Sequence, residues 1–161
     1  MRELDAILPV YEFSERHRVT ADASSERLDR ALREVTFGEV PVVRALLWVR
    51  GIRRPGNGER VLTAMKRRGE VVDDVPGEGV VLSVPGQFWR LRGGRGDGPD
   101  AVAVVDFRVG SGSLTTETRV HVADGVARRR FARYWRVIRP FSRLTRILLL
   151  RAAKRRAEAR A

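Results

Sequence analysis

The chain has 161 residues, of which 43% are hydrophobic and 32% charged, and this balance excludes a disordered, collagen-like or low-complexity protein. It contains no Cys and only two His, which excludes a disulfide framework, a thiolate metal site and a Cys nucleophile, so we expect no metal and no cofactor. The formal net charge is +12, and residues 125–161 alone sum to +12, so the whole imbalance lies in the last part of the chain.

The length predicts a single domain over residues 1–161. The first five residues are acidic and short of apolar side chains, unlike a signal peptide or a transit sequence. No apolar run approaches the ~20 residues that a membrane-spanning helix needs. We therefore expect a cytoplasmic protein.

The first third of the chain predicts one strand and two helices. Residues 1–15 are expected to form a loosely structured arm, and residues 16–23 alternate as a strand does. Ser24 is the predicted N-cap of the first helix. Pro41 suits the first turn of a second helix, which is apolar nearly all round, so it must be covered on most sides.

Strand-like runs with short turn signals between them fill the middle of the chain. They span residues 60–66, 70–75, 79–89, 101–110 and 113–123. Connections this short favour antiparallel pairing, because a parallel crossover needs a dozen or more residues. The Gly-rich segment 93–98 lacks the lysine and the hydroxyl of a phosphate-binding loop, and we interpret it as a flexible hairpin connection.

The last 37 residues follow one helical pattern, for which Asp124 is the predicted N-cap. Pro140 is expected to kink this helix, because proline removes a backbone donor. Beyond Leu150 the sequence is basic all round, so residues 151–161 are expected to leave the body of the protein as a basic tail. The apolar stripe of the helix comprises Phe131, Trp135, Ile138, Phe141, Leu148 and Ala152.

The order of these elements and three segments of the chain carry a family resemblance. The segments HRVTADASSERLDRAL, VPGEGVVLSVPGQFW and TETRVHVADGVARRRFARYWRVIRPF resemble the START-like (helix-grip) superfamily, over about residues 14–150. This superfamily includes polyketide cyclases and aromatases, lipid-transfer domains and birch-pollen-allergen-like proteins, and the chain looks most like its uncharacterised bacterial members.

The resemblance implies an α+β fold. Its parts are a curved antiparallel sheet of six or seven strands, two short helices after the first strand, and a long C-terminal helix packed across the sheet. It also implies a cavity between sheet and helix that holds a lipid-like or polycyclic molecule. No catalytic residue of the superfamily is matched in this chain.

Residue parity separates two faces of the strand at 113–123. Its apolar face, which includes Thr116 and Thr118, is expected to face inward, where the two hydroxyls either orient a ligand or bond to nearby backbone. The opposite parity predicts an exposed ladder of charges. This ladder comprises Asp106, Arg108, Glu117 and Arg119.

The large aromatic side chains either fill the core or line a pocket, and we interpret them, with the inner threonines, as pocket lining. The predicted ligand-binding residues are Trp48, Phe88, Trp89, Phe107, Thr116, Thr118, Tyr134, Trp135, Ile138 and Phe141. We predict no catalytic residue, because the strand carboxylates fall on the outer parity. His17 and His121 are interpreted as solvated surface residues.

These observations predict a protein that binds a hydrophobic or amphipathic small molecule. Two alternatives stay open. One is an enzyme of the polyketide cyclase or dehydratase kind, which needs an ionisable side chain inside the pocket. The other is an interaction module that docks on an anionic membrane, a protein or a second copy of the chain through residues 141–156. Nucleic acid is disfavoured, since arginine also predominates where no anionic partner is suspected.

Overall fold

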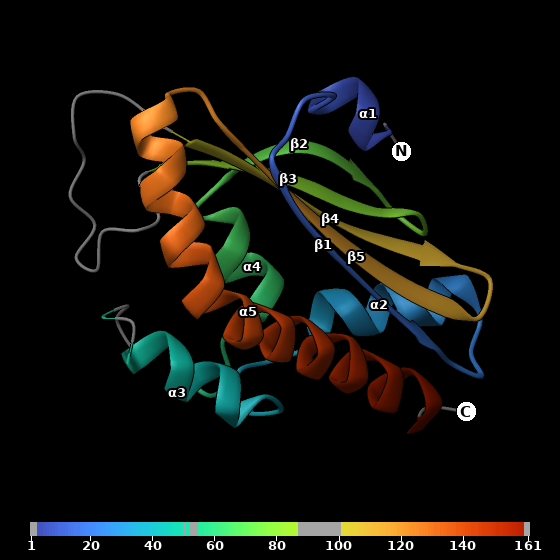
Figure 1. The fold of residues 1–161 in the computed structure, drawn as a ribbon. Helices are drawn as coiled ribbons and strands as arrows, with labels where there is room; N and C mark the ends of the chain where they lie inside the picture. The colour runs from blue at the N-terminus through green and yellow to red at the C-terminus, as the bar shows by residue number, and fades with distance from the viewer. Residues whose placement is uncertain (1–2, 50, 52–54, 87–100, 160–161) are drawn as a thin grey trace.

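A computed structural model describes residues 3–49, 51, 55–86 and 101–159 of the chain. These residues form an α+β fold in which a long C-terminal helix packs across a five-stranded antiparallel sheet (Figure 1). The expected six or seven strands and two short helices are therefore wrong for the part of the chain that the structure describes. None of its helices is long and apolar enough to span a bilayer.

The sheet is open and has the order β1-β5-β4-β3-β2. Its strands are β1 (Phe13–Thr20), β2 (Glu70–Val75), β3 (Gly79–Pro85), β4 (Ala101–Gly110) and β5 (Ser113–Val122). Every pairing is antiparallel, as the short connections predict. Residues 87–89, which the sequence assigned to the third of these strands, lie outside the described residues.

The helices are α1 (Leu4–Ile7), α2 (Ser25–Glu34), α3 (Pro41–Val49), α4 (Val61–Lys66) and α5 (Gly125–Ala159). Both predicted N-caps are confirmed. The Ser24 hydroxyl accepts a hydrogen bond from the Arg27 N–H at 3.4 Å. The Asp124 carboxylate accepts from the N–H groups of Val126 and Ala127, each at 2.8 Å.

The segment predicted as a strand at residues 60–66 is helix α4. Val61 and Leu62 are buried in the core, and Met65 packs against the same cluster one turn later. This spacing suits a helix, but an apolar run of six residues does not by itself distinguish a helix from a strand. The first strand also begins earlier than predicted, at Phe13, inside the expected arm.

Two hydrophobic clusters lie between the sheet and its helices. The larger one joins α2, α4 and the C-terminal half of α5 to β3, β4 and β5, and the smaller one joins Phe131 and Ala127 to the other end of β4 and β5. The expectation that residues beyond Leu150 leave the body is wrong, because Ala153 and Ala157 are buried. Arg156 in this segment pairs with Glu34 and Glu39 of the neighbouring helix and loop.

The opposite face of the sheet is covered by the N-terminal segment. Leu4 of α1 packs against Val81 and Val104, whose side chains lie on this outer face. The sequence did not predict this cover, because nothing in the apolar pattern of residues 1–15 identifies the face that they pack against.

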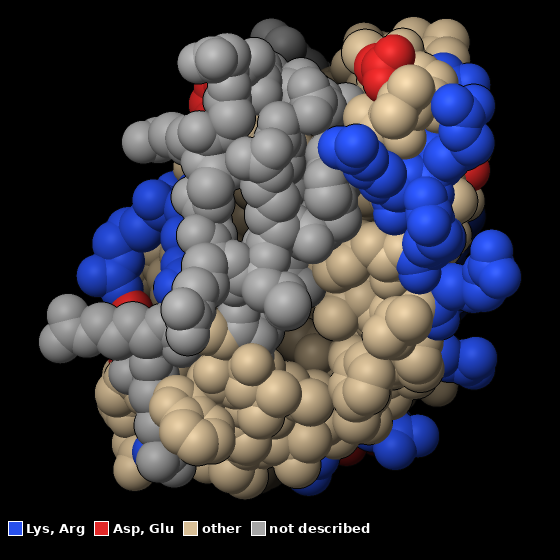
Figure 2. All heavy atoms as spheres, turned by 60° about the vertical axis from the view of Figure 1, so that its left-hand side comes forward, with Lys and Arg blue, Asp and Glu red and all other residues tan. Residues whose placement is uncertain are grey.

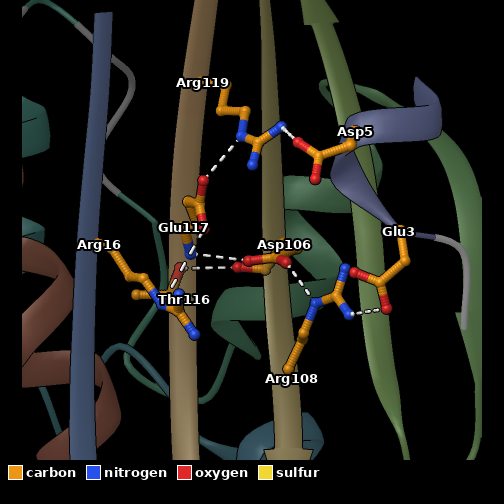
Figure 3. Close-up of polar contacts among 8 residues, drawn as sticks. All are labelled: Glu3, Asp5, Arg16, Asp106, Arg108, Thr116, Glu117 and Arg119. Atoms are coloured by element: carbon orange, nitrogen blue, oxygen red, sulfur yellow. Dashed lines mark hydrogen bonds and ion pairs between the residues drawn. The ribbon is translucent and has the colours of Figure 1, made fainter. Parts of the chain in front are cut away.

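The charge ladder on the outer face is formed, but it is not exposed (Figure 3). The Asp106 carboxylate is 1% exposed and accepts from Arg108 Nε and from the Glu117 N–H, each at 2.7 Å. Burial raises the pKa of Asp106, although these two hydrogen bonds act against the rise. Arg119 donates to Glu117 at 2.7 Å and to Asp5 of α1 at 2.5 Å, so the arm closes over the ladder.

Helix α5 changes direction along its length, as Figure 1 shows. Pro140 lies inside the helix, where it removes one backbone donor and crowds the preceding turn. The N-terminal half of α5 runs beside the β1–β5 side of the sheet, and the C-terminal half packs on α2. The two halves therefore enclose different parts of the interior.

Candidate ligand-binding cavity

A cavity of about 950 Å³ lies between the inner face of the sheet and helices α3, α4 and α5. Its lining is largely apolar. The sheet contributes Val84, Ala103, Val105, Thr118 and Val120, and α5 contributes residues from Phe131 to Leu149. A volume of this size is within the range of pockets that take drug-sized molecules.

Aromatic rings gather at one end of the cavity. The ring of Phe131 lies 4.7 Å from that of Phe13 and 5.7 Å from that of Trp135, measured between centroids. Tyr134 lies 5.7 Å from Phe131 in the same way. The rings of Phe131 and Trp135 are stacked and the other pairs are tilted, so this end of the cavity has an aromatic wall.

Half of the predicted ligand-binding residues lie on the cavity wall. They are Thr118, Tyr134, Trp135, Ile138 and Phe141. Four of them come from the apolar stripe of α5 and its neighbour Tyr134, and the fifth comes from the inner face of β5. The helical spacing and the strand parity therefore identified residues that the fold brings together.

The other predicted residues are placed elsewhere. Phe107 and Thr116 are buried and do not belong to the lining residues, and the Thr116 hydroxyl donates to the Asp106 carbonyl at 2.7 Å. Trp48 is 65% exposed at the end of α3, because the inner side of this helix is formed by Val43, Leu46 and Leu47. Phe88 and Trp89 lie outside the described residues.

Arg146 is one of the polar residues on the cavity wall that the sequence did not predict. Arg146 projects from α5 into the region above Phe107, with its guanidinium 5.5 Å from the centre of that ring. Helical spacing places Arg146 on the same side of α5 as Ser142 and Leu149, which lie four residues before it and three residues after it. Both of these residues line the cavity.

The environment of Arg146 is unusual for a charged group. Its Nη1 is inaccessible to solvent and has no hydrogen-bond partner in the described part of the chain. Burial lowers the pKa of Arg146 to about 10, and the charges of Glu15 and Asp106 oppose this shift. The guanidinium therefore remains charged at neutral pH.

A carboxylate and a histidine also face inward, from β1. Glu15 and His17 alternate with exposed residues along the strand, and their side chains are 6% and 13% exposed. Glu15 Oε1 lies 3.2 Å from His17 Nε2. The interpretation of His17 as a solvated surface residue is therefore wrong, because β1 starts earlier than predicted and its inner parity includes both residues.

His121 lies on the outer face of β5, as its parity predicts, and its side chain is 34% exposed. Its Nδ1 is 3.3 Å from Glu12 Oε2, so it is partly covered by the segment before β1. It lies on the face away from the cavity.

A second depression, of about 380 Å³, lies at the C-terminal end of α5. Its polar side chains include Glu39 and Arg156, which already pair with each other at 3.1 Å. We found no group of three His, Asp or Glu able to hold a metal within the described ranges. Of these two depressions the cavity beneath α5 is the larger, and its lining includes Arg146, whose Nη1 has no hydrogen-bond partner in the described part of the chain.

Comparisons with family models, with curated proteins and with solved structures found no match to this chain.

Proposed function

We propose that the protein binds a hydrophobic or amphipathic small molecule in the cavity between the sheet and α5. The observation that carries this proposal is the cavity of about 950 Å³ with a largely apolar wall. Burial of an apolar ligand there removes its surface from water, at roughly 25 cal/mol per Å² before the costs of association. The aromatic end of the wall suits a flat or polycyclic ligand body.

The proposal is tested by filling the cavity from α5. Ile138 lines it, so Ile138→Trp places a large ring inside, whereas Val126→Trp adds the same ring at an exposed position of the same helix. Calorimetric titration uses two uncharged probes, methyl 2-naphthoate and 1-dodecanol. We expect the wild type and V126W to bind at least one probe and I138W to bind it at least about tenfold more weakly.

Absence of binding by the wild type to both probes contradicts the proposal. Equal binding by I138W and V126W contradicts it as well, since the probe then binds elsewhere. Circular dichroism of each variant shows whether the fold is intact.

A polyketide cyclase or dehydratase activity has one supporting feature, the inward carboxylate of Glu15 beside His17. A general base must reach its proton through a hydrogen bond or one water. Neither Glu15 nor His17 belongs to the residues that line the cavity. We therefore favour ligand binding over catalysis as the function of this cavity.

A second candidate function is docking on an anionic membrane surface. Arginines line the solvent side of α5 next to an uncharged surface, as the line of basic side chains in Figure 2 shows. The exposed large apolar residues of α5 are Val126, Val137, Phe141 and Leu144. Within the predicted contact range 141–156, Leu149 and Leu150 are buried, so the proposed surface is confined to the part around Phe141 and Leu144.

A further inference from the structure

We propose that the cavity ligand carries an anionic group, such as a carboxylate, on an apolar body, and that Arg146 binds this group. This inference rests on the proposed function, because it requires a ligand in the cavity beneath α5. It adds the chemical class of the ligand and the residue that recognises its charge.

The guanidinium of Arg146 is enclosed without a hydrogen-bond partner. No hydrogen bond or ion pair joins it to another side chain within the described ranges, and Nη1 is inaccessible to solvent. The ring of Phe107, at 5.5 Å, offers only a weak attraction by comparison with an anion. A buried charge without a partner is unfavourable, and an anionic group of a ligand would supply the missing counter-charge.

Two carboxylates, Asp106 and Glu15, lie near enough for their charges to act on Arg146. Asp106 lies on the outer face of the sheet and accepts from Arg108 and from the Glu117 N–H. Glu15 lies beside His17, and its Oε2 has no hydrogen-bond partner in the described part of the chain. Both attract the Arg146 cation through space, but neither bonds to it in the described part of the chain.

The cavity wall carries a positive net charge. Its charged lining residues are Glu59, Arg67, Arg68 and Arg146, and Glu59 forms an ion pair with Arg67. Two cations therefore remain, one near α4 and one on α5, and the wall is positive. The exposed arginines of α5 add to this potential, which draws an anion toward the cavity.

Arg146 differs in its position from the other residues that have an enclosed polar atom without a hydrogen bond. Those atoms belong to Glu15, His17, Arg27, Asp29, Arg44 and His121, and none of these residues lines the cavity. Arg146 alone in this group contributes to the wall. A guanidinium presents its donors as a planar fork that matches a carboxylate in two hydrogen bonds.

The experiment compares 2-naphthoic acid with its methyl ester, which has nearly the same shape and no charge. Calorimetry of the full chain at pH 7.5 measures both ligands with the wild type, with Arg146→Met and with Arg143→Met. Arg143 is exposed three residues earlier on the same helix and does not line the cavity, so it is the matched control.

We expect the wild type and R143M to bind the acid at least about tenfold more tightly than the ester, the scale of a charge-assisted hydrogen bond. R146M should lose this preference through weaker binding of the acid, with binding of the ester kept within about threefold. Arg146→Lys should keep part of the preference, since it retains the charge without the fork.

Equal affinity of the wild type for acid and ester overturns the inference and leaves the proposed function standing. An acid preference that survives in R146M also overturns it. If the wild type binds neither ligand nor 1-dodecanol, the proposed function fails and the inference fails with it. Thermal unfolding of R146M and R146K shows that both variants are folded.

Discussion

Gly79 opens β3 in a backbone conformation that excludes a side chain. Its φ is +134°, and a Cβ at this position would lie 1.9 Å from the carbonyl oxygen of Phe107. Gly79→Ala must therefore shift the pairing of β3 with β4 at the centre of the sheet. We expect it to lower the free energy of unfolding by about 2 kcal/mol or more, as measured by urea denaturation.

Gly56 is the control for this substitution. It has no positive φ, and a Cβ there would meet no atom within 4 Å. Gly56→Ala should change the free energy of unfolding by less than about 0.5 kcal/mol. Similar losses for G79A and G56A would show that the close approach of Phe107 to Gly79 does not matter for stability.

At the scale of residues, the sequence identified those wall residues whose position follows from the period of a single helix or strand. The stripe through Trp135, Ile138 and Phe141 followed from helical spacing, and Thr118 followed from strand parity. Arg146 was missed because it is a charged residue at an inner phase of α5, and arginine is rarely buried. Glu15 was missed because β1 begins at Phe13, inside the segment expected to form an arm.

At the scale of elements, the caps and turns were predictable and the cover of the outer face was not. Ser24 and Asp124 act locally, so their residue types alone indicate where α2 and α5 begin. Helix α4 was mistaken for a strand because its six residues are too few to show a period. The cover comes from α1, whose Leu4 packs on Val104 of β4 although a hundred residues separate them in the sequence.

The exposed side of α5 gives the membrane candidate a direct test. Leu144 is 41% exposed beside the arginines of this helix and does not line the cavity. If this surface docks on lipid, the full chain should sediment with phosphatidylserine-containing vesicles and detach as salt rises. Leu144→Asp should weaken the sedimentation, because it places an anion among lipids of the same sign.

Val71→Asp is the matched control, since Val71 is 42% exposed on β2, away from α5. It should leave sedimentation unchanged. Equal sedimentation with neutral phosphatidylcholine vesicles, or equal losses in L144D and V71D, would count against docking through α5.

At the scale of the whole molecule, several ion pairs tie the helices to the sheet and make stability depend on pH. Asp74 of β2 pairs with Arg33 of α2 at 2.8 Å and with Lys66 of α4. Burial acts to raise the pKa of Asp74, but the hydrogen bonds from Lys66 and Arg33 outweigh it and hold the pKa below its ordinary value. The pKa of Glu39 is lowered in the same way, because hydrogen bonds from Thr36 and Arg156 outweigh the effect of burial, which acts to raise it.

A carboxyl group whose pKa is lower in the folded state binds fewer protons there than in the unfolded state. Its stabilisation is present above the unfolded pKa, near 4, and is lost as the pH falls through the folded value. We expect the free energy of unfolding to fall as the pH drops below about 4. Asp74→Asn should make this fall shallower and cost less than about 1 kcal/mol at pH 7, since the pair is partly exposed.

Urea titrations of the wild type and D74N from pH 7 to pH 2 measure both effects. A variant with the same acid dependence as the wild type would show that Asp74 does not contribute to it.

The bend in α5 gives the two halves of the helix different surroundings. The C-terminal half completes the larger hydrophobic cluster with α2 and α4, whereas residues 131–142 supply part of the cavity wall. The wall also shares residues with the hydrophobic clusters, among them Val105, Phe131 and Leu149. Val137 and Phe141 line the cavity and are exposed, so they are the wall positions of α5 where a substitution reshapes the cavity without opening the buried core.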